Sequence, residues 1–253
     1  MRGLILAAGR GRRLGAVGEG RPKCLVPVAG RPLLEWQRQA LEEAGIVERA
    51  IVCGYAAEHL PLQGWTRFVN WRWEKTGVVA SLRAAGVWLR ENPCVVSYAD
   101  IVYGPETIAA LRDTPGDIAI TSYVHWRALW TARFPEPLLD AETFEADATG
   151  RLLTIGERPR RLDDIQGQFM GLVKLTPAGF ERILRYLEEV GPAAADRLDM
   201  TGMLRGLIQA GCPVQSRSVD EFWYEIDNVS DLELFPAWTS QTAGGSRFAR
   251  HSG

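Results

Sequence analysis

Basic side chains follow a short apolar run near the start of the chain. The run from Gly3 to Ala8 breaks into Gly9-Arg10-Gly11-Arg12-Arg13-Leu14, and Arg21-Pro22-Lys23 comes further along. Glycines that expose backbone N–H groups beside fixed positive charge suit the binding of a polyphosphate. Leu14 stands where a dinucleotide fingerprint has its third glycine, and no Gly-Lys-Ser/Thr sequence is present. We therefore predict a phosphate-binding loop of another type.

Two aspartates follow strand-like runs far from this loop. Asp100 comes after the apolar run 93–98, and Asp227 comes after the run 223–226. Ligands of open α/β sheets bind at the carboxyl ends of strands, and Mg²⁺ takes one or two carboxylates together with phosphate oxygens. Each residue alone is equally explained as a turn or helix-cap residue. Considered with the loop, the two aspartates are predicted ligands of Mg²⁺.

The elements that must position these residues alternate between strand and helix patterns, which indicates an α/β sheet with crossover helices. The turn-like sequence Asp147-Ala148-Thr149-Gly150 lies between two short apolar runs and predicts an antiparallel hairpin inserted in that sheet. The expected strands are 3–8, 49–53, 66–70, 93–98, 117–124, 144–146, 152–155, 169–175, 214–218 and 222–226, the last two completing the sheet. The expected helices are 33–44, 79–90, 105–112, 177–190 and 199–210.

Composition limits the function classes. The chain has 253 residues, of which 46% are hydrophobic, and this is enough for one large domain over residues 1–238. A net charge of −2 argues against a nucleic-acid partner. The four cysteines form no C-x-x-C pair, and no segment is apolar enough for a membrane, so we expect a cytoplasmic protein with free thiols. The polar tail 239–253 is expected to be disordered.

These motifs carry a resemblance to a known family. The chain resembles the nucleotidyltransferase superfamily, which joins NTPs to phosphorylated sugars and alcohols. Within it, residues 1–236 are similar to the phosphocholine cytidylyltransferase-like branch, which includes enzymes acting on phosphonates. The residues that carry the resemblance are Leu6-Ala7-Ala8-Gly9-Arg10-Gly11-Arg12-Arg13-Leu14, Arg21-Pro22-Lys23-Cys24-Leu25-Val26-Pro27-Val28, Trp73 to Leu82, Ser97 to Val102, Gln166 to Leu172 and Trp223 to Asp227.

The resemblance implies a fold and a set of site residues. The fold would be a Rossmann-like three-layer α/β/α nucleotidyltransferase domain with a mixed, mostly parallel sheet. Arg13 and Lys23 would act as catalytic residues that contact the phosphates of CTP, and Asp100 and Asp227 would hold Mg²⁺. Members of the family often carry Asn where Gly77 stands. The implied nucleotide-binding residues are Leu6, Ala7, Ala8, Gly9, Gly11, Arg13, Lys23, Ser81 and Ala99.

The insertion at about residues 123–170 is where this branch places its acceptor. An aromatic face would suit a quaternary ammonium group, although tryptophans are equally common in cores. Arg133 is a candidate for the acceptor's phosphate or phosphonate, and an acidic residue could meet a cation. The expected acceptor-binding residues are Trp126, Arg133, Glu142, Gln168 and Glu225.

Three functions stay open on the sequence. The first is transfer of CMP from CTP to a small phosphorylated alcohol or an alkylphosphonate, with release of pyrophosphate. The second is a sugar-1-phosphate nucleotidyltransferase, which would need several polar groups for the sugar hydroxyls. The third is a nucleotide-binding regulator without turnover, although the presence of Arg13, Lys23, Asp100 and Asp227 together argues against it. A homodimer is compatible with each.

Overall fold

A seven-stranded sheet forms the centre of the computed structural model, which describes residues 1–61, 63–242 and 244–248. Four of its six neighbouring strand pairs are parallel. The two antiparallel pairs both involve β11, which separates a four-stranded parallel block from a two-stranded one. The sheet is therefore mixed and mostly parallel, as predicted. The order is β12 (Gln215–Val219), β8 (Ile118–Tyr123), β11 (Gln168–Leu175), β6 (Cys94–Tyr98), β1 (Arg2–Ala7), β4 (Arg49–Cys53) and β5 (Thr66–Val69).

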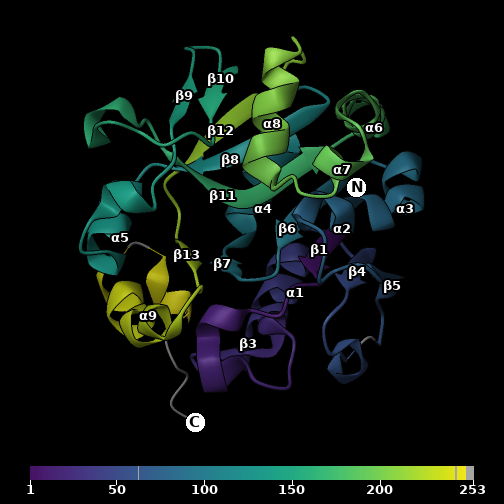
Figure 1. Ribbon diagram of the computed structural model, residues 1–253. Helices are drawn as coiled ribbons and strands as arrows, with labels where there is room; N and C mark the ends of the chain where they lie inside the picture. Colours follow the sequence, from purple (N-terminus) through teal and green to yellow (C-terminus); the bar gives the residue numbers. More distant parts are fainter. Residues whose placement is uncertain (62, 243, 249–253) are drawn as a thin grey trace.

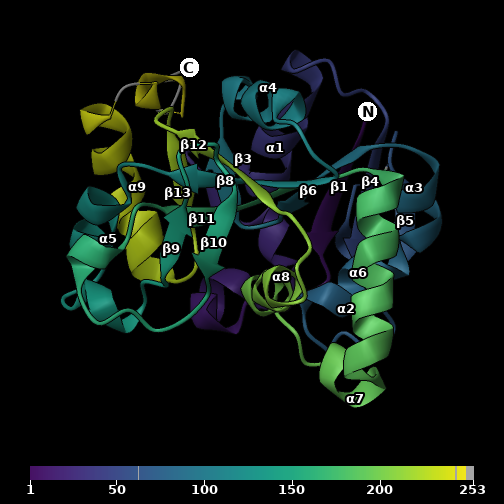
Figure 2. The same cartoon turned by 90° about the horizontal axis from the view of Figure 1, so that it is seen from above.

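Helices cover both faces of this sheet (Figures 1 and 2). Seen from above in Figure 2, α1 (Leu33–Glu43) and α4 (Pro105–Asp113) lie on one face. The opposite face carries α2 (Val78–Ala84), α6 (Pro177–Val190), α7 (Pro192–Ala195) and α8 (Met200–Gln209), with α3 (Gly86–Glu91) beside α6. Helices α5 (Trp126–Arg133) and α9 (Val229–Gln241) pack together beyond the β12 side. The result is the expected three-layer α/β/α arrangement.

The run around residues 222–226 is not part of the central sheet, which corrects one expectation. It forms β13 (Trp223–Glu225), which pairs antiparallel with β7 (Ile101–Tyr103) in a separate two-stranded ribbon. The backbone N–H of Ile226 also donates to the carbonyl of Asp100 at 2.9 Å. The ribbon therefore brings Asp100 and Asp227 together by direct strand pairing. The sequence instead predicts that the two residues follow two strands of the central sheet.

Two further expectations need correction. The helix expected over 79–90 is two helices, α2 and α3, because Ala85 departs from helical geometry with φ −95° and ψ 23°. Part of the supposed tail is ordered: Thr239 lies in α9, and Phe248 is 2% exposed against Trp36 and Phe222. The segment has a polar composition on average, which is why the sequence predicts disorder there, but this one apolar ring packs into the core. Residues 249–253 lie outside the described residues.

The predicted hairpin is present in the insertion. It consists of β9 (Phe144–Ala146) and β10 (Leu152–Ile155), paired antiparallel. Asp147 closes the turn, because its Oδ1 accepts the backbone N–H groups of Thr149 at 2.8 Å and Arg151 at 3.0 Å. A second, minimal antiparallel pair, β2 (Pro27–Val28) and β3 (Arg31–Pro32), connects the basic loop to α1.

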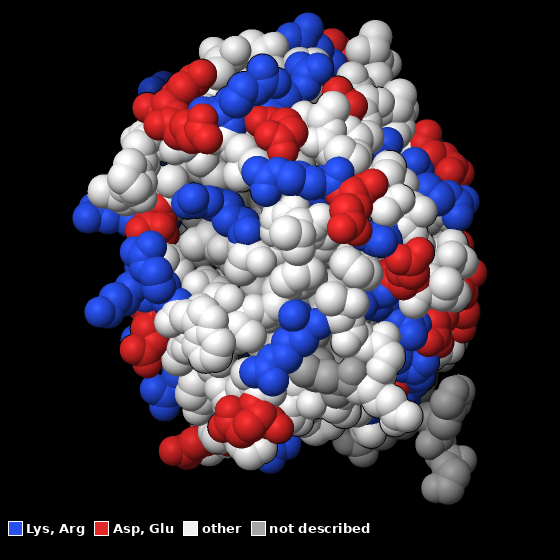
Figure 3. Space-filling view, turned by 90° about the vertical axis from the view of Figure 1, so that its right-hand side faces the viewer, with Lys and Arg blue, Asp and Glu red and all other residues white. Residues whose placement is uncertain are grey.

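The surface carries both signs of charge. Figure 3 shows basic and acidic side chains interspersed over the face that lies on the right in Figure 1. Along the described ranges, no helix combines the length and the apolar character that crossing a bilayer requires.

Candidate active site

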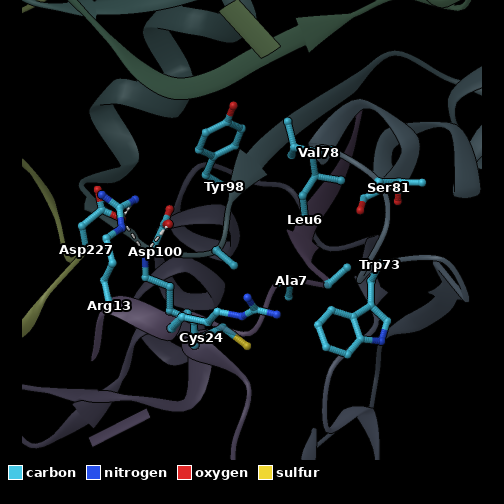
Figure 4. Close-up of a pocket in the computed structure, with 18 residues that line it drawn as sticks. Leu6, Ala7, Arg13, Cys24, Trp73, Val78, Ser81, Tyr98, Asp100 and Asp227 are labelled. Carbon is cyan, nitrogen blue, oxygen red and sulfur yellow. Dashed lines mark hydrogen bonds and ion pairs between the residues drawn. The ribbon is translucent and has the colours of Figure 1, made fainter. Parts of the chain in front are cut away.

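A cavity of about 380 Å³ opens beside the carboxyl ends of β1 and β6. All nine residues expected to bind the nucleotide line it, together with Asp100 and Asp227. In Figure 4 the two aspartates and Arg13 lie at one end of the cavity, whereas Trp73 and Ser81 lie at the other. The cavity thus has an acidic end and an uncharged end. The acidic end suits the phosphates of a nucleotide together with a cation, and the uncharged end suits its base.

The basic loop is shaped by Gly11. Its φ of +65° lies in the left-handed region that favours glycine, and a Cβ there would lie 3.1 Å from side-chain carbons of Lys23. The N–H of Leu14 then donates to the carbonyl of Gly11, which begins a 3₁₀ turn over Arg12–Gly18. The glycine therefore lets the loop pack against the Lys23 stem, and this contact helps to orient the amine.

Lys23 lies between the two aspartates. Its Nζ donates to Asp100 Oδ2 and to Asp227 Oδ1, each at 2.7 Å, and its side chain is 13% exposed. Burial disfavours the charged amine, but the charges of Asp100 and Asp227 outweigh it and raise the pKa of Lys23 above its ordinary value. Burial also raises the pKa of Asp227, but Lys23 reverses this and holds the pKa below its usual range. Lys23 and Asp227 are therefore both charged at neutral pH.

A third carboxylate, Glu225, joins the aspartates. Oxygens of Asp100, Glu225 and Asp227, which we call the acidic cluster, lie within 4.8 Å of one another. Burial, then the charges of Asp227 and Asp100, raise the pKa of Glu225. Within the described residues, Asp100 Oδ1 is buried and has no hydrogen-bond partner. Hard carboxylate oxygens, one of them without a partner, fit a divalent cation such as Mg²⁺.

Arg13 is more exposed than Lys23 and Arg133, the two other cations that pair with the acidic cluster. Its side chain is 68% exposed, and one guanidinium nitrogen donates to Asp227 Oδ1 at 3.2 Å. A single exposed ion pair of this kind holds a side chain weakly, with a typical contribution of about 0.2–1 kcal/mol. Arg13 therefore lies within reach of a phosphate group without losing a buried contact.

The uncharged end is organised by Asn70. Its amide nitrogen donates to Thr76 Oγ1 and to Ser81 Oγ, both at 3.1 Å, and the Thr76 hydroxyl donates in turn to a backbone carbonyl. The Ser81 hydroxyl thus accepts from Asn70 and keeps its own proton for a group in the cavity. Trp73 forms the neighbouring wall and packs edge-on against Tyr55, with ring centroids 5.4 Å apart.

Gly77 allows a close approach of two loops at this end. Its N–H donates to the carbonyl of Asp196 at 2.7 Å, and a Cβ at this position would lie 2.3 Å from the carbonyl oxygen of Leu198. No side chain fits at that distance unless backbone moves. The absence of the Asn that family members often carry at this position therefore has a local steric cause.

The expected acceptor residues divide into two groups, and three of them are structural. Trp126 is 3% exposed and packs against Trp130. Gln168 is 4% exposed, and its amide exchanges hydrogen bonds with the backbone of Glu142. The Arg133 side chain is completely buried and is paired with carboxylates, which corrects its interpretation as an exposed phosphate ligand. Burial of an arginine requires such partners, and they leave it no group for the acceptor.

Glu142 and Glu225 instead belong to a group of carboxylates around Tyr98. Burial first, and then the charges of Asp100, Asp199, Glu225 and Glu142, raise the pKa of the Tyr98 hydroxyl. Figure 4 shows this hydroxyl directed away from Ala7 and Trp73. Phe169 meets the Tyr98 ring edge-on at 6.0 Å. This region beside the acidic cluster therefore combines aromatic surface with carboxyl groups.

Sequence reasoning missed the structural importance of several residues. Tyr98 and Trp73 lay inside recognised motifs, where their aromatic type was the available signal. Asn70 ends a strand-like run and gave no chemical signal. Asp231 stands three residues after Asn228, a spacing typical of a capping box, and the structure contains that box. No sequence signal connected Asp231 to Arg133, 98 residues earlier.

Comparison with known protein families gives a match over more than half of the chain. The family model of the MobA-like NTP transferase domain matches residues 3–163. The matched part includes the basic loop, Ser81 and Asp100, and it stops before Glu225 and Asp227.

Two relatives extend the similarity along most of the chain. A CTP:phosphoglutamine cytidylyltransferase from Campylobacter jejuni is 30% identical over 250 residues, which cover 92% of this chain and 98% of the relative. A CMP-5′-(3-aminopropyl)phosphonate synthase from Streptomyces rubellomurinus is 30% identical over 247 residues, which cover 91% of this chain. The chain spans only 37% of the length of that second relative.

A solved structure shares the fold. The inositol-1-phosphate CTP transferase from T. maritima superposes with a TM-score of 0.73 and 17% sequence identity, covering 96% of this chain and 97% of the other. The seven-stranded mixed sheet with its helical layers is thus an arrangement that nucleotidyltransferases use.

Proposed function

The chain belongs to the MobA-like NTP transferase domain family, and from this premise we propose that it is a Mg²⁺-dependent cytidylyltransferase. It transfers CMP from CTP to a small phosphate or phosphonate that carries a positively charged nitrogen. The observation that carries the proposal is the juxtaposition of the nucleotide-sized cavity, the acidic cluster and the carboxylates around Tyr98.

The cavity supports binding of CTP along its length. Backbone groups of Leu6 to Gly9 line it next to Ser81, whose hydroxyl proton is available to a nucleobase carbonyl. Lys23 and Arg13 are at the other end, within reach of the phosphates. The choice of cytosine follows the two relatives, whose names contain CTP and CMP.

The transfer step requires no protein base. A phosphate or phosphonate oxygen of the acceptor is already anionic at neutral pH and attacks the α-phosphorus of CTP. The new bond joins that oxygen to the α-phosphorus, the bond from the α-phosphorus to the bridging oxygen of the β-phosphate breaks, and pyrophosphate leaves with the electron pair. Catalysis then consists of positioning two anions and neutralising their charge.

The protein's own residues supply most of this neutralisation. Lys23 and Arg13 stabilise charge on the transferring group and on pyrophosphate. Asp100 and Asp227, with Glu225 beside them, would hold Mg²⁺, which supplies Lewis-acid neutralisation of the phosphate oxygens when bound. Asp100 is the best placed of the three, because its buried Oδ1 lacks a partner among the described residues.

A cationic nitrogen on the acceptor follows from the charge around Tyr98. Glu142 and Asp199 place carboxylates there, and the Tyr98 and Phe169 rings contribute aromatic surface. Carboxylates and aromatic faces together bind ammonium groups. Phosphoglutamine and 3-aminopropylphosphonate, named for the two relatives, each contain an amino nitrogen, and phosphocholine contains a quaternary one.

A pyrophosphate-release assay tests the proposal. Each of the four NTPs is paired with phosphocholine, 3-aminopropylphosphonate, phosphoglutamine and glucose-1-phosphate, and 3,3-dimethylbutyl phosphate serves as the uncharged analogue of phosphocholine. We expect turnover with CTP and at least one nitrogen-containing acceptor. When that acceptor is phosphocholine, the uncharged analogue should have a kcat/KM at least about 10-fold lower, since it lacks the cation. Preferred turnover of glucose-1-phosphate would identify a sugar nucleotidyltransferase instead, and nucleotide binding without turnover would identify a regulator.

A further inference from the structure

Arg133 makes an unusual set of contacts outside the cavity. Its Nε donates to Asp231 Oδ1 at 2.9 Å, and its Nη2 donates to Asp231 Oδ2 at 3.2 Å, which is a bidentate pair. Its Nη1 donates to Glu225 Oε2 at 3.1 Å, and its Nη2 lies 3.9 Å from Asp227 Oδ2. One buried guanidinium thus touches two members of the acidic cluster and a further aspartate behind them.

Asp231 transmits this contact to the backbone. It is 1% exposed, and its Oδ2 accepts the N–H of Asp227 at 2.8 Å and that of Asn228 at 3.0 Å. Asn228 in turn accepts the N–H of Asp231, so the start of α9 is closed by a reciprocal pair. The peptide that carries Asp227 is therefore fixed by a carboxylate that Arg133 itself holds.

The orientation of the guanidinium is constrained on its faces as well. Its central carbon lies 5.4 Å from the Trp130 ring centroid and 4.9 Å from that of Phe134. Trp130 is held in turn by stacking on Trp223 of β13, at 6.1 Å with an interplanar angle of 8°. Helix α5, the ribbon and α9 thus all contact one another around the Arg133 side chain.

From these contacts we propose that Arg133 is a positioning residue for the acidic cluster. It holds Glu225 directly, and it holds Asp227 through Asp231. Both carboxylates are thereby kept in the arrangement in which the cluster holds a divalent cation. The Arg133 side chain is completely buried, and Arg133 is not among the residues that line the cavity. Its planar fork makes a bidentate pair with Asp231 and donates to Glu225 at the same time, a geometry that the single ammonium nitrogen of a lysine does not reproduce. Outer contacts of this kind commonly change metal affinity 10–100-fold. The inference rests on the proposed function only in assigning the metal to the acidic cluster.

Binding of Mn²⁺ to the full-length protein, followed by electron paramagnetic resonance with and without CTP, tests this role. Arg133→Lys and Asp231→Asn should each raise the Kd for Mn²⁺ about 10–100-fold. Arg127→Lys is the matched control, because Arg127 lies on the same helix but is 51% exposed and pairs only with Asp163 at the surface. Its Kd should stay within about twofold of wild type. In turnover, saturating metal should restore kcat in the two variants, which separates positioning from loss of a catalytic group.

The double variant tests the route through Asp231. Residues that act as one unit give non-additive losses, so Arg133→Lys combined with Asp231→Asn should bind Mn²⁺ little worse than either single variant. Fully additive losses, or wild-type affinity in a folded Arg133→Lys protein, would overturn the inference. If that variant does not fold, Asp231→Asn carries the test. If the wild-type protein binds no Mn²⁺, both the metal site and this inference are wrong. Pyrophosphate release tests the proposed transfer separately, so the two failures can be distinguished.

Discussion

The Lys23 ammonium lies 2.7 Å from an Asp227 carboxylate oxygen, although 204 residues separate the two along the chain. The same amine lies 2.7 Å from Asp100, so it neutralises part of the charge that the acidic cluster concentrates. This contact joins the basic loop to the ribbon. It brings an N-terminal motif and a C-terminal aspartate to the same cavity.

Replacement of Lys23 by Ala should lower kcat about 100-fold or more, because one preorganised electrostatic contact to the phosphates is lost. The kcat is measured by pyrophosphate release at saturating CTP and acceptor. Lys75→Ala is the control, since Lys75 is exposed, and it should retain wild-type turnover. Near wild-type kcat in Lys23→Ala would contradict the catalytic assignment.

Loss of one cluster carboxylate should weaken the response to metal. For Asp100→Asn and Asp227→Asn we expect the Mg²⁺ concentration at half-maximal rate to rise at least about 10-fold, because a neutral amide is a poorer ligand for a hard cation. A titration of rate against Mg²⁺ measures this. Asp113→Asn, at an exposed surface pair with Arg112, should leave the titration unchanged. Unchanged curves for both cluster variants would exclude these residues as ligands.

Acceptor binding should depend on pH through Glu142. Burial raises the pKa of this carboxyl, against a smaller lowering by the Thr201 hydroxyl. Only the ionised form attracts a cationic acceptor, so the acceptor KM should fall as pH rises through that raised pKa, above the ordinary value of about 4.3. Glu142→Gln should abolish this part of the pH profile, and the remaining slope belongs to titration of Glu225 and of the acceptor. An identical profile in the variant would show that Glu142 does not contact the acceptor.

A side chain at Gly77 should disturb the uncharged end of the cavity. Gly77→Ala places a Cβ 2.3 Å from the Leu198 carbonyl oxygen, so the two loops must separate. We expect the KM for CTP to rise about 10-fold or more, since small displacements in a binding site are costly. Gly86→Ala is the matched control, because its nearest neighbour is a flexible arginine end at 3.4 Å. Steady-state kinetics distinguishes the two, and equal KM values would contradict the steric argument.

The ordered end of the chain should contribute to stability. Phe248 is buried against Phe222, with ring centroids 4.6 Å apart. Phe248→Ala should lower the free energy of unfolding by about 3 kcal/mol, at the lower end for a buried phenylalanine. Chemical denaturation measures this, with Leu139→Ala as a control at a 65%-exposed position. No loss of stability would restore the view of residues 239–248 as a disordered tail.

Local patterns predicted the parts of the fold that depend on local physics. The strand over 3–8 follows from a continuous apolar run, the hairpin 144–155 from its turn residues and the loop around Gly11 from its glycines, and the structure contains all three. The separate ribbon could not be predicted, because pairing of β7 with β13 depends on partners more than 100 residues apart. The burial of Arg133 was missed for the same reason, since its partner Asp231 is distant in sequence. The roles of the site residues remain predictions.

The ribbon also has a consequence for synthesis of the protein. The ribosome makes the basic loop, the base-lining helix α2 and Asp100 within the first 100 residues, whereas Glu225 and Asp227 come last. A nascent or truncated chain that ends before Trp223 has most of the cavity wall but lacks the strand that delivers the other carboxylates. Such a chain therefore keeps the basic loop, α2 and Asp100 but lacks two of the three carboxylates of the acidic cluster.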